Sequence, residues 1–343
     1  MEDTITVGLD IAKSVFHVHV ADSSGRVLQS RKLRRSQVEP FFAKLPRAIV
    51  GIEACGTAHY WARQLRALGH EVRLIPAAYV RPFVKRNKND ARDAEAICEA
   101  VRRPTMKFVT IKTIAQQAAR GLERARDLLV KQHTQLRNCV RSLLAELGFT
   151  AAQGERGFAE LVQQMEAAEA EVVPEAMKAA LRPLVRQIGL LAAEIAALEQ
   201  QIVAAARHDP LMRRLATIPG VGPITAHAMV TAVGDGRQFR SARDFAAWCG
   251  LTPQERSSAG KRRDKGISRQ GERRLRKLFA LGASTVMRNA RARAERATEW
   301  QRGILARRPV KVAVLAQAAK TSRIAWAVLT SGETYRRPAQ VAA

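Results

Sequence analysis

The sequence predicts a three-part protein: an α/β domain in residues 1–112, a helical segment in residues 113–207, and a mostly helical domain in residues 208–343. Three observations lead to this division. Short apolar runs alternate with helical patterns in the first part, and leucines recur at heptad spacing in the second. The third part combines helical patterns with glycine-rich turns and a large excess of basic residues. A chain of 343 residues is long enough for two or three domains with cores of their own.

Five apolar runs in the first part predict strands. Three follow one another with short turns, which indicates an antiparallel meander, and two alternate with helical patterns. A meander followed by βαβ alternation describes an RNase H-like sheet. The predicted strands are residues 5–9, 16–21, 27–33, 48–52 and 71–75, and the predicted helices are residues 38–45 and 59–68.

The middle part carries two heptad patterns. Leucines recur every seven residues at Leu122, Leu129, Leu136 and Leu143. A second series alternates steps of four and three, as in a heptad seam; it comprises Leu184, Ile188, Leu191, Ile195, Leu198 and Ile202. We expect two long helices that pair as a coiled coil, within one chain or between chains. A helical hairpin with no role in oligomerisation is the alternative.

The third part opens with a glycine-rich turn between two apolar helical patterns. Gly220 and Gly222 lie in Ile218-Pro219-Gly220-Val221-Gly222-Pro223. This pattern resembles a helix-hairpin-helix, in which glycines let backbone amides approach a phosphate at a helix N-terminus. A simple turn between helices is the alternative.

Four carboxylates occupy positions from which they could converge. Asp10 lies in the first strand pattern, Glu53 ends the fourth, and Asp90 and Asp93 lie three residues apart where a helix begins. Such a cluster is costly unless divalent metal neutralises it. Cations held by carboxylates drive phosphodiester chemistry, so these residues predict nucleic-acid strand cleavage or transfer. His17 and His19 share one strand face, and we interpret them as ordinary strand residues.

The charge balance indicates a polyanionic partner. The chain carries 58 basic and 31 acidic residues, a net charge of +27. Residues 1–112 have a net charge of +9, residues 113–207 of zero, and residues 208–343 of +18. Nucleic acid should therefore contact the two ends of the chain. The residues predicted to bind it are Gly220, Gly222, Lys261, Arg262, Arg263, Arg269, Arg273 and Arg274.

The absence of several sequence motifs argues against some classes of protein. The four cysteines are scattered, which argues against a zinc site and against a disulfide framework. No Walker motif indicates nucleotide hydrolysis. No apolar stretch is expected to span a membrane and no signal peptide is expected, so we predict a cytoplasmic protein.

A serine-containing loop follows the glycine-rich turn. Ser257, Ser258 and Ser268 lie in or beside a strongly basic stretch, because residues 260–308 hold 16 basic and 4 acidic residues. Arginines can activate a serine and hold a scissile phosphate. From residue chemistry alone, each of these serines is more typical of a turn or a helix cap.

With these motifs in view, the chain resembles the DEDD transposases of bacterial insertion sequences, relatives of the pilin-gene invertase. Five ordered motifs carry the resemblance. They are Gly8-Leu9-Asp10-Ile11-Ala12-Lys13, Ile52-Glu53-Ala54-Cys55-Gly56-Thr57, Asn87-Lys88-Asn89-Asp90-Ala91-Arg92-Asp93-Ala94, Ile218-Pro219-Gly220-Val221-Gly222 and Phe245-Ala246-Ala247-Trp248-Cys249-Gly250-Leu251-Thr252-Pro253.

The resemblance implies a specific chemistry. It implies a Holliday-junction-resolvase-like domain whose Asp10, Glu53, Asp90 and Asp93 bind Mg²⁺, with Mn²⁺ able to substitute. It implies a coiled coil that builds dimers or tetramers, and a serine that joins covalently to DNA through a 5′-phosphoserine link; Ser258 matches best and Ser257 is adjacent. It also implies guidance by a structured noncoding RNA, a bridge RNA. Because the serine lies far beyond Asp93 in the sequence, the active site would be composite.

Two other functions remain open from the sequence. A structure-specific nuclease would cut junctions with metal-activated water and leave Ser258 structural. A non-catalytic nucleic-acid-binding protein would retain only the scaffold, although the intact acidic tetrad argues against it. Covalent protein–DNA adducts separate the first alternative from the recombinase.

Overall fold

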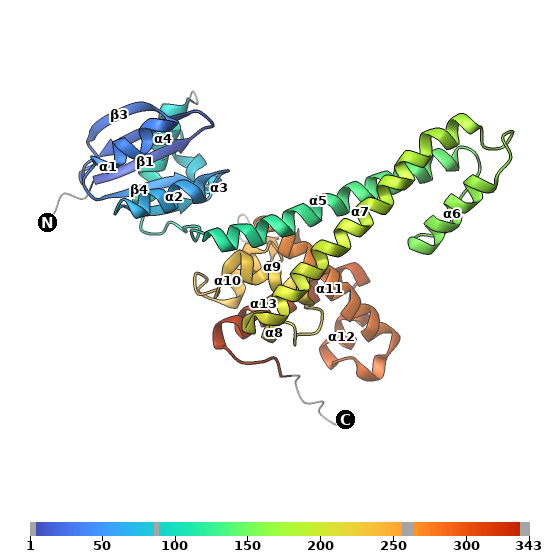
Figure 1. Cartoon of the computed structure of the whole chain (residues 1–343). Coiled ribbons are helices and arrows are strands. Elements are labelled where there is room, and N and C mark those ends of the chain that lie inside the picture. Colours follow the sequence, from blue (N-terminus) through green and yellow to red (C-terminus); the bar gives the residue numbers. More distant parts are fainter. Residues whose placement is uncertain (1–4, 86–88, 256–263, 337–343) are drawn as a thin grey trace. The chain divides into compact units, whose positions relative to one another are not determined.

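The computed structural model describes residues 5–85, 89–255 and 264–336, and the chain falls into two units, residues 1–114 and 115–343. The first unit is built on a mixed sheet, and the second is mostly helical (Figure 1). The predicted α/β N-terminal part and the mostly helical remainder are thus confirmed. The long helices of residues 113–207 belong to the same unit as the helices that follow them.

The first unit contains a five-stranded sheet in the order β3-β2-β1-β4-β5. The β1–β2 and β2–β3 pairs are antiparallel, and the β1–β4 and β4–β5 pairs are parallel. All five predicted strands and both predicted helices are present. The elements are β1 (Ile5–Ile11), β2 (Val15–Ala21), β3 (Val27–Arg34), η1 (Arg35–Gln37), α1 (Val38–Ala43), β4 (Ala48–Glu53), α2 (Ala58–Ala67), β5 (Glu71–Ile75), α3 (Ala77–Val80), η2 (Arg81–Phe83) and α4 (Asp90–Val101).

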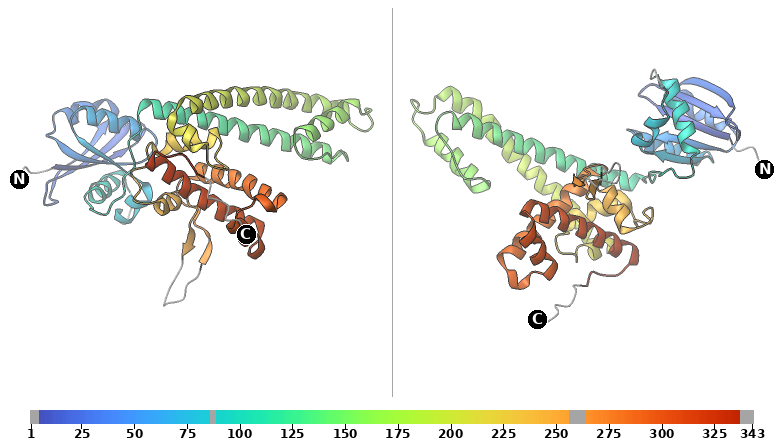
Figure 2. Two further views of the ribbon diagram at one scale, coloured as in Figure 1. Left: turned by 90° about the horizontal axis from the view of Figure 1, so that it is seen from below. Right: turned by 180° about the vertical axis from the view of Figure 1, so that it is seen from behind.

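The two faces of this sheet are covered by different helices (Figure 2). Side chains alternate along a strand, so Val7 and Leu9 point to the core formed with α1 and α2. Gly8 and Asp10 point to the opposite face, where α4 packs on the sheet. The residues that bear the chemistry therefore share the α4 face.

Close contact between α4 and the sheet depends on two glycines. Gly8 and Gly51 are register partners on β1 and β4. A Cβ atom at Gly8 would collide with the carbonyl oxygen of Ala94 and lie 2.6 Å from the amide nitrogen of Cys98. A Cβ at Gly51 would lie 2.9 Å from the Cβ of Val101. The missing side chains let the helix backbone lie directly on the strands.

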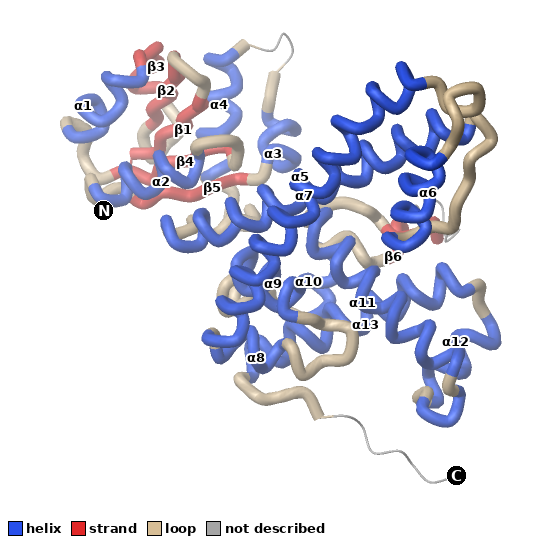
Figure 3. Tube along the Cα trace, turned by 45° about the vertical axis from the view of Figure 1, so that its right-hand side comes forward, coloured by secondary structure: helices blue, strands red, loops and turns tan. Residues whose placement is uncertain are grey.

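The second unit is helical apart from a two-stranded antiparallel ribbon, β6–β7 (Figure 3). The ribbon was not predicted, because three- and four-residue strands leave too little periodicity to detect. The elements are α5 (Ile114–Ala145), α6 (Glu155–Ala167), α7 (Glu175–His208), α8 (Pro210–Leu215), α9 (Pro223–Val233), α10 (Ala242–Trp248), β6 (Pro253–Glu255), β7 (Asp264–Ile267), α11 (Arg273–Ala292), η3 (Ala294–Arg296), α12 (Glu299–Arg307) and α13 (Val310–Ser331).

Helices α5 and α7 form an antiparallel hairpin within the chain (Figures 1 and 2). Near its tip, Val140 and Leu144 of α5 share a core with Leu181 and Ile188 of α7 and with residues of α6. Nearer the other end, Arg126 of α5 forms an ion pair with Glu199 of α7. All six predicted seam positions of α7 are buried or half-buried.

The heptad predicted for α5 is wrong at its last position. Leu143 is 36% exposed, whereas Val140 and Leu144 are fully buried. An α-helix has 3.6 residues per turn, so a strict spacing of seven drifts around the helix. The residue of α5 that packs against α6 is therefore Leu144, one position after the predicted Leu143.

The expectation that no stretch reaches the length of a membrane span is wrong for α7. By length and composition alone this helix could cross a membrane. Its apolar stretch, however, carries the heptad seam that packs on α5 and contains Glu199, which is paired with Arg126. We interpret α7 as one arm of the helical hairpin.

The core of the remaining helices surrounds α9. Eight of its residues are buried, which is typical of a central helix. Phe245 of α10, Phe279 of α11 and Ala325 of α13 belong to the same core. Gly220, which has a φ of +85°, lies against Gly282 of α11, and a Cβ on either residue would meet the other's backbone. The glycine-rich turn is thus fixed by packing on α11.

Replacing Gly8 with alanine should destabilise the first unit. The new methyl group would meet the backbone of α4, which cannot rotate away as a flexible side chain could. We expect a loss of roughly 2–4 kcal/mol in the free energy of unfolding, from overpacking of a rigid contact. Gly56→Ala is the control, because nothing lies within 4 Å of a Cβ there. Urea unfolding followed by far-UV circular dichroism measures both, and equal stabilities would contradict the close packing.

Two consecutive leucines of α7 that differ in exposure should respond differently to replacement by aspartate. Leu191 is 6% exposed and Leu190 is 62% exposed. We expect Leu191→Asp to lower the free energy of unfolding by about 3–5 kcal/mol, since it removes buried apolar area and leaves a charge in the seam. The adjacent Leu190→Asp should change it by less than about 1 kcal/mol. Thermal unfolding, helicity and light-scattering mass report the result; equal effects would mean that the seam is not a packing surface.

Candidate metal centre

The start of α4 is fixed by a side-chain cap. The side chain of Asn89 accepts a hydrogen bond of 2.9 Å from the backbone N–H of Arg92. Asparagine at this position favours helix initiation, so the helix begins at Asp90. Asp90 and Asp93 then lie in the first turn on one face, near the positive end of the helix dipole.

Three carboxylates converge between β1 and α4. Each of Asp10, Asp90 and Asp93 offers one oxygen atom, and these atoms all lie within 4.8 Å of one another. Asp10 and Asp93 are half-buried, whereas Asp90 is exposed. The convergence of an acid at the sheet centre with two acids of a helix is as the sequence indicates.

Glu53 lies beside this group. The parallel register that pairs Leu9 with Ile52 continues to Asp10 and Glu53, which places both on the same face. Its charge contributes to the raised pKa of Asp10. Glu53 is not among the residues whose oxygens lie within 4.8 Å of one another.

The electrostatics of Asp10 reflect this crowding. Burial is the largest cause that raises the pKa of Asp10 to about 6. The negative charges of Asp93, Asp90 and Glu53, in that order, contribute to the same rise, and His17 acts in the opposite direction. Like charges held together in this way favour either a proton or a cation between them.

The donor set fits a hard divalent cation. Carboxylate oxygens are the preferred ligands of Mg²⁺ and Ca²⁺, and ligand atoms around one Mg²⁺ are separated by roughly 3–4 Å. The three oxygens, all within 4.8 Å of one another, are close enough to share one cation.

The sequence analysis did not recognise one residue at this centre. His17 lies opposite Asp10 in the β1–β2 register, and its Nε2 is 3.5 Å from an Oδ2 oxygen of Asp90. The short turn between the strands contained the signal, because it fixes which residues face each other. A titratable ring therefore adjoins the acidic cluster.

The two glycines of the predicted helix-hairpin-helix lie between α8 and α9 and differ in their surroundings. Gly220 is packed against Gly282, as described above. Gly222 is exposed at the N-terminal cap of α9, and nothing lies within 4 Å of a Cβ built there. Only Gly222 leaves space beside backbone amides that a phosphate could approach.

The arginines predicted to bind nucleic acid differ in their exposure. Arg269 and Arg273 are exposed before and at the start of α11. Arg274 instead points inward, with its guanidinium paired to Glu123 and 3.0 Å from an oxygen of Asp127. Ser268 is described and half-buried. The predicted residues Ser257, Ser258, Lys261, Arg262 and Arg263 lie outside the described residues.

Arg274 belongs to a buried charge cluster that the sequence did not reveal. Glu123 of α5 is 2% exposed and accepts from Arg274. Its other oxygen lies 2.6 Å from Nδ1 of His227 on α9. Because the three residues come from three helices far apart in the sequence, no local pattern could have paired them.

Comparisons with known proteins identify relatives of this chain among transposases. A family model of the DEDD class of IS110, described as a transposase, matches residues 7–149, and one described as "Transposase IS116/IS110/IS902 family" matches residues 212–298. A Pseudomonas aeruginosa protein named "Probable family 20 transposase" is 45% identical, over 96% of this chain and 98% of its own length. The transposases for insertion sequence elements IS1328 of Yersinia enterocolitica and IS1111A of Coxiella burnetii are each 38% identical over 98% of this chain, and over 100% and 92% of their own lengths.

Asp10→Asn should stabilise the metal-free protein. The raised pKa of Asp10, about 6, means that its charge opposes folding above pH 6. We expect a higher melting temperature than wild type at pH 7.5 in chelator, with the difference vanishing below about pH 4, where the wild-type carboxyl is protonated in both states. Added Mg²⁺ should raise the melting temperature of wild type only.

Asp22→Asn provides a control of opposite sign. The hydrogen bond from Ser24 lowers the pKa of Asp22, so its charge favours folding at pH 7.5. Calorimetry of the three proteins makes the comparison. A lower melting temperature for Asp10→Asn in chelator would contradict repulsion at the acidic centre.

Proposed function

Because the chain belongs to the IS116/IS110/IS902 family of transposases, we propose that it cuts and exchanges DNA strands at the ends of an insertion sequence through metal held by its acidic centre. Members of this family are DNA-binding enzymes of strand cleavage and transfer that use divalent metal. The convergence of Asp10, Asp90 and Asp93 carries the proposal, since a bound divalent cation neutralises so close a set of carboxylates near neutral pH.

We assign the metal ligands to Asp10, Glu53, Asp90 and Asp93, and the metal to Mg²⁺ with Mn²⁺ as a substitute. A divalent cation bound there would polarise the scissile phosphate and neutralise the charge that develops during cleavage. Asp10 is held by the sheet and Asp93 by the capped helix, so the ligands are positioned before the substrate arrives. Asp90 forms the exposed side of the centre, and the half-buried His17 lies beside it.

We assign the first unit to the RNase H-like fold. The sheet order, with an antiparallel β3-β2-β1 meander followed by parallel β4 and β5, supports this assignment. The position of Asp10 on the central strand supports it as well.

We propose Ser258 as the nucleophile. Its oxygen would attack the scissile phosphorus, forming a P–O bond to serine as the P–O3′ bond breaks. The serine proton is released, and the departing 3′ oxygen takes up a proton. The reverse attack by a 3′ hydroxyl on the phosphoserine restores the serine and seals the strand without ATP. In support, the segment that carries Ser258 connects β6 and β7 and follows the Leu251-Thr252-Pro253 motif.

We also propose three functional segments with the predicted bounds. Residues 1–112 carry the metal centre. Residues 113–207 supply an oligomerisation surface for a dimer or tetramer, supported by the apolar hairpin of α5 and α7. Residues 208–343, with a net charge of +18, bind DNA and a structured guide RNA and include the helix-hairpin-helix at Gly220 and Gly222. The bacterial cytoplasm, at the nucleoid, is the place where such a protein meets its DNA.

Serine variants test the proposed chemistry. With labelled DNA that carries the element's ends, wild type should give a protein–DNA adduct on denaturing gels. Ser258→Ala should bind DNA yet give neither cleavage nor adduct, because the attacking oxygen is missing. Ser268→Ala is the matched control and should retain the adduct. Asp10→Asn should lose both products while keeping its fold.

Results that differ from these expectations would identify another mechanism or another function. Full cleavage by Ser258→Ala, with free 5′ phosphates and no adduct, would establish a nuclease that activates water. An adduct that peptide mapping assigns to Ser257 would move the nucleophile by one residue. DNA binding without cleavage by wild type in Mg²⁺ would favour a non-catalytic binding protein.

A further inference from the structure

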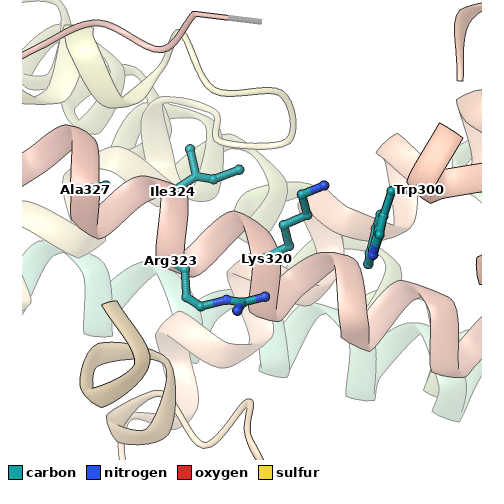
Figure 4. Close-up of a pocket in the computed structure, with 5 residues that line it drawn as sticks. All are labelled: Trp300, Lys320, Arg323, Ile324 and Ala327. Carbon is teal, nitrogen blue, oxygen red and sulfur yellow. The ribbon is translucent and has the colours of Figure 1, made fainter. Parts of the chain in front are cut away.

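The last two helices, α12 and α13, border an open pocket that the acidic centre and the serine chemistry leave without a role. It has a volume of about 480 Å³ and is lined by Trp300 of α12 and by Lys320, Arg323, Ile324 and Ala327 of α13 (Figure 4). These residues follow the segment matched by the C-terminal family model, which ends at residue 298.

The pocket combines an apolar wall with two cations. The ring of Trp300 and the side chains of Ile324 and Ala327 supply the wall. The ammonium nitrogen of Lys320 lies 4.4 Å from the centre of the Trp300 ring. Arg323 donates from Nε to the carbonyl oxygen of Ala319. Within the described residues, neither cation has a carboxylate partner.

The cations lack a compensating anion. Burial lowers the pKa of Lys320, and the nearby charge of Arg323 lowers it further. Two like charges held beside an apolar wall favour an anion that can neutralise both. A phosphate group offers that charge and several acceptor oxygens.

Buried polar contacts hold the pocket in shape. Thr298 and Gln301 form a capping box that begins α12 and sets the position of Trp300. Gln301 donates to the side chain of Gln317, which is 7% exposed and donates in turn to Thr321. This chain of amides ties α12 to α13, so Trp300 and Lys320 face each other in a fixed arrangement.

We propose that this pocket binds an unpaired nucleotide of single-stranded nucleic acid. The phosphate lies between Lys320 and Arg323, and the base lies against the wall of Trp300, Ile324 and Ala327. The pocket is open to solvent, so a base that remains part of a strand can reach it. A base within a duplex is stacked on its neighbours and cannot enter, whereas aromatic walls beside cations are the usual platform for single strands.

The surroundings favour a strand over a free nucleotide. Residues 288–323 carry ten basic and two acidic residues, so neighbouring phosphates would meet further cations. The inference rests on the proposed function, in that the strand is displaced DNA or an unpaired part of the guide RNA. Both sources present the same base and phosphate chemistry.

Binding of short labelled oligonucleotides to the full chain tests the pocket. Every protein carries Asp10→Asn and is kept in chelator, so cleavage does not contribute. The probes are a 12-nucleotide DNA, the RNA of the same sequence, and the blunt DNA duplex. The variants are Trp300→Leu and Lys320→Gln, with Lys311→Gln as the matched control because Lys311 is an exposed cation of the same helix outside the pocket.

We expect Trp300→Leu to weaken single-strand binding by about five- to thirtyfold, the loss of one base contact, with duplex binding unchanged. Lys320→Gln should weaken it less and should lower the salt dependence by the slope of about one phosphate contact, roughly 0.7. Lys311→Gln should leave single-strand affinity within about twofold of its parent. A greater loss with RNA identifies the guide as the source, and a greater loss with DNA identifies the displaced strand.

Three results would overturn the proposal. Equal losses on duplex and single strand would show a general phosphate surface. Unchanged single-strand affinity in both variants, with wild-type helicity, would show that no nucleotide enters. A change in light-scattering mass without a change in affinity would assign the pocket to another copy of the chain. DNA cleavage by the chain with Asp10 intact is scored separately, so failure of the pocket and failure of the proposed function are distinguishable.

Discussion

The acidic centre depends on the contact between α4 and the bare backbone of the sheet. Gly8 lies two residues before Asp10 and on the same face, so the helix approaches most closely beside the central acid. At the other end of the contact, the Asn89 cap fixes the residue at which the helix begins. Together these two constraints place Asp90 and Asp93 over Asp10. A side chain at Gly8 would lift the helix and separate the carboxylates, although none of them had changed.

A different solution fixes the helices of the second unit. Glu123 on α5 is buried between His227 of α9 and Arg274 of α11, and the adjacent Arg126 pairs with Glu199 of α7. Removing one partner of a buried ion pair typically lowers the free energy of unfolding by about 3–5 kcal/mol, because the other charge stays buried with neither a partner nor water around it. The network therefore fixes the position of α5 relative to α7, α9 and α11, because a shift of α5 along its own axis would break these ion pairs. It also removes Arg274 from the cations available to phosphate.

The charged side chains of the molecule thus fall into three groups with different surroundings. Carboxylates crowd one small region, where burial and their mutual repulsion raise the pKa of Asp10. Carboxylates elsewhere, such as Glu123 and Glu199, neutralise arginines between helices. The cations that remain exposed, among them Arg269 and Arg273, give the second unit its positive surface. A protein that must hold both metal and a polyanion needs this separation, because free arginines near the metal would compete for its ligands.

The sequence by itself determined the five strands of the first unit and the carboxylates that meet between β1 and α4. Alternation and glycine-flanked apolar runs located all five strands, and the spacing of Asp90 and Asp93 at a helix start placed both on one face. Local patterns carry that information because strand and helix periods are properties of neighbouring residues. Tertiary structure alone decided the rest. It set His17 beside Asp90, buried Arg274 against Glu123, moved the α5 stripe from Leu143 to Leu144, and brought Trp300 over Lys320. Each of these depends on which surfaces pack together, and packing between distant segments leaves no period in a single sequence.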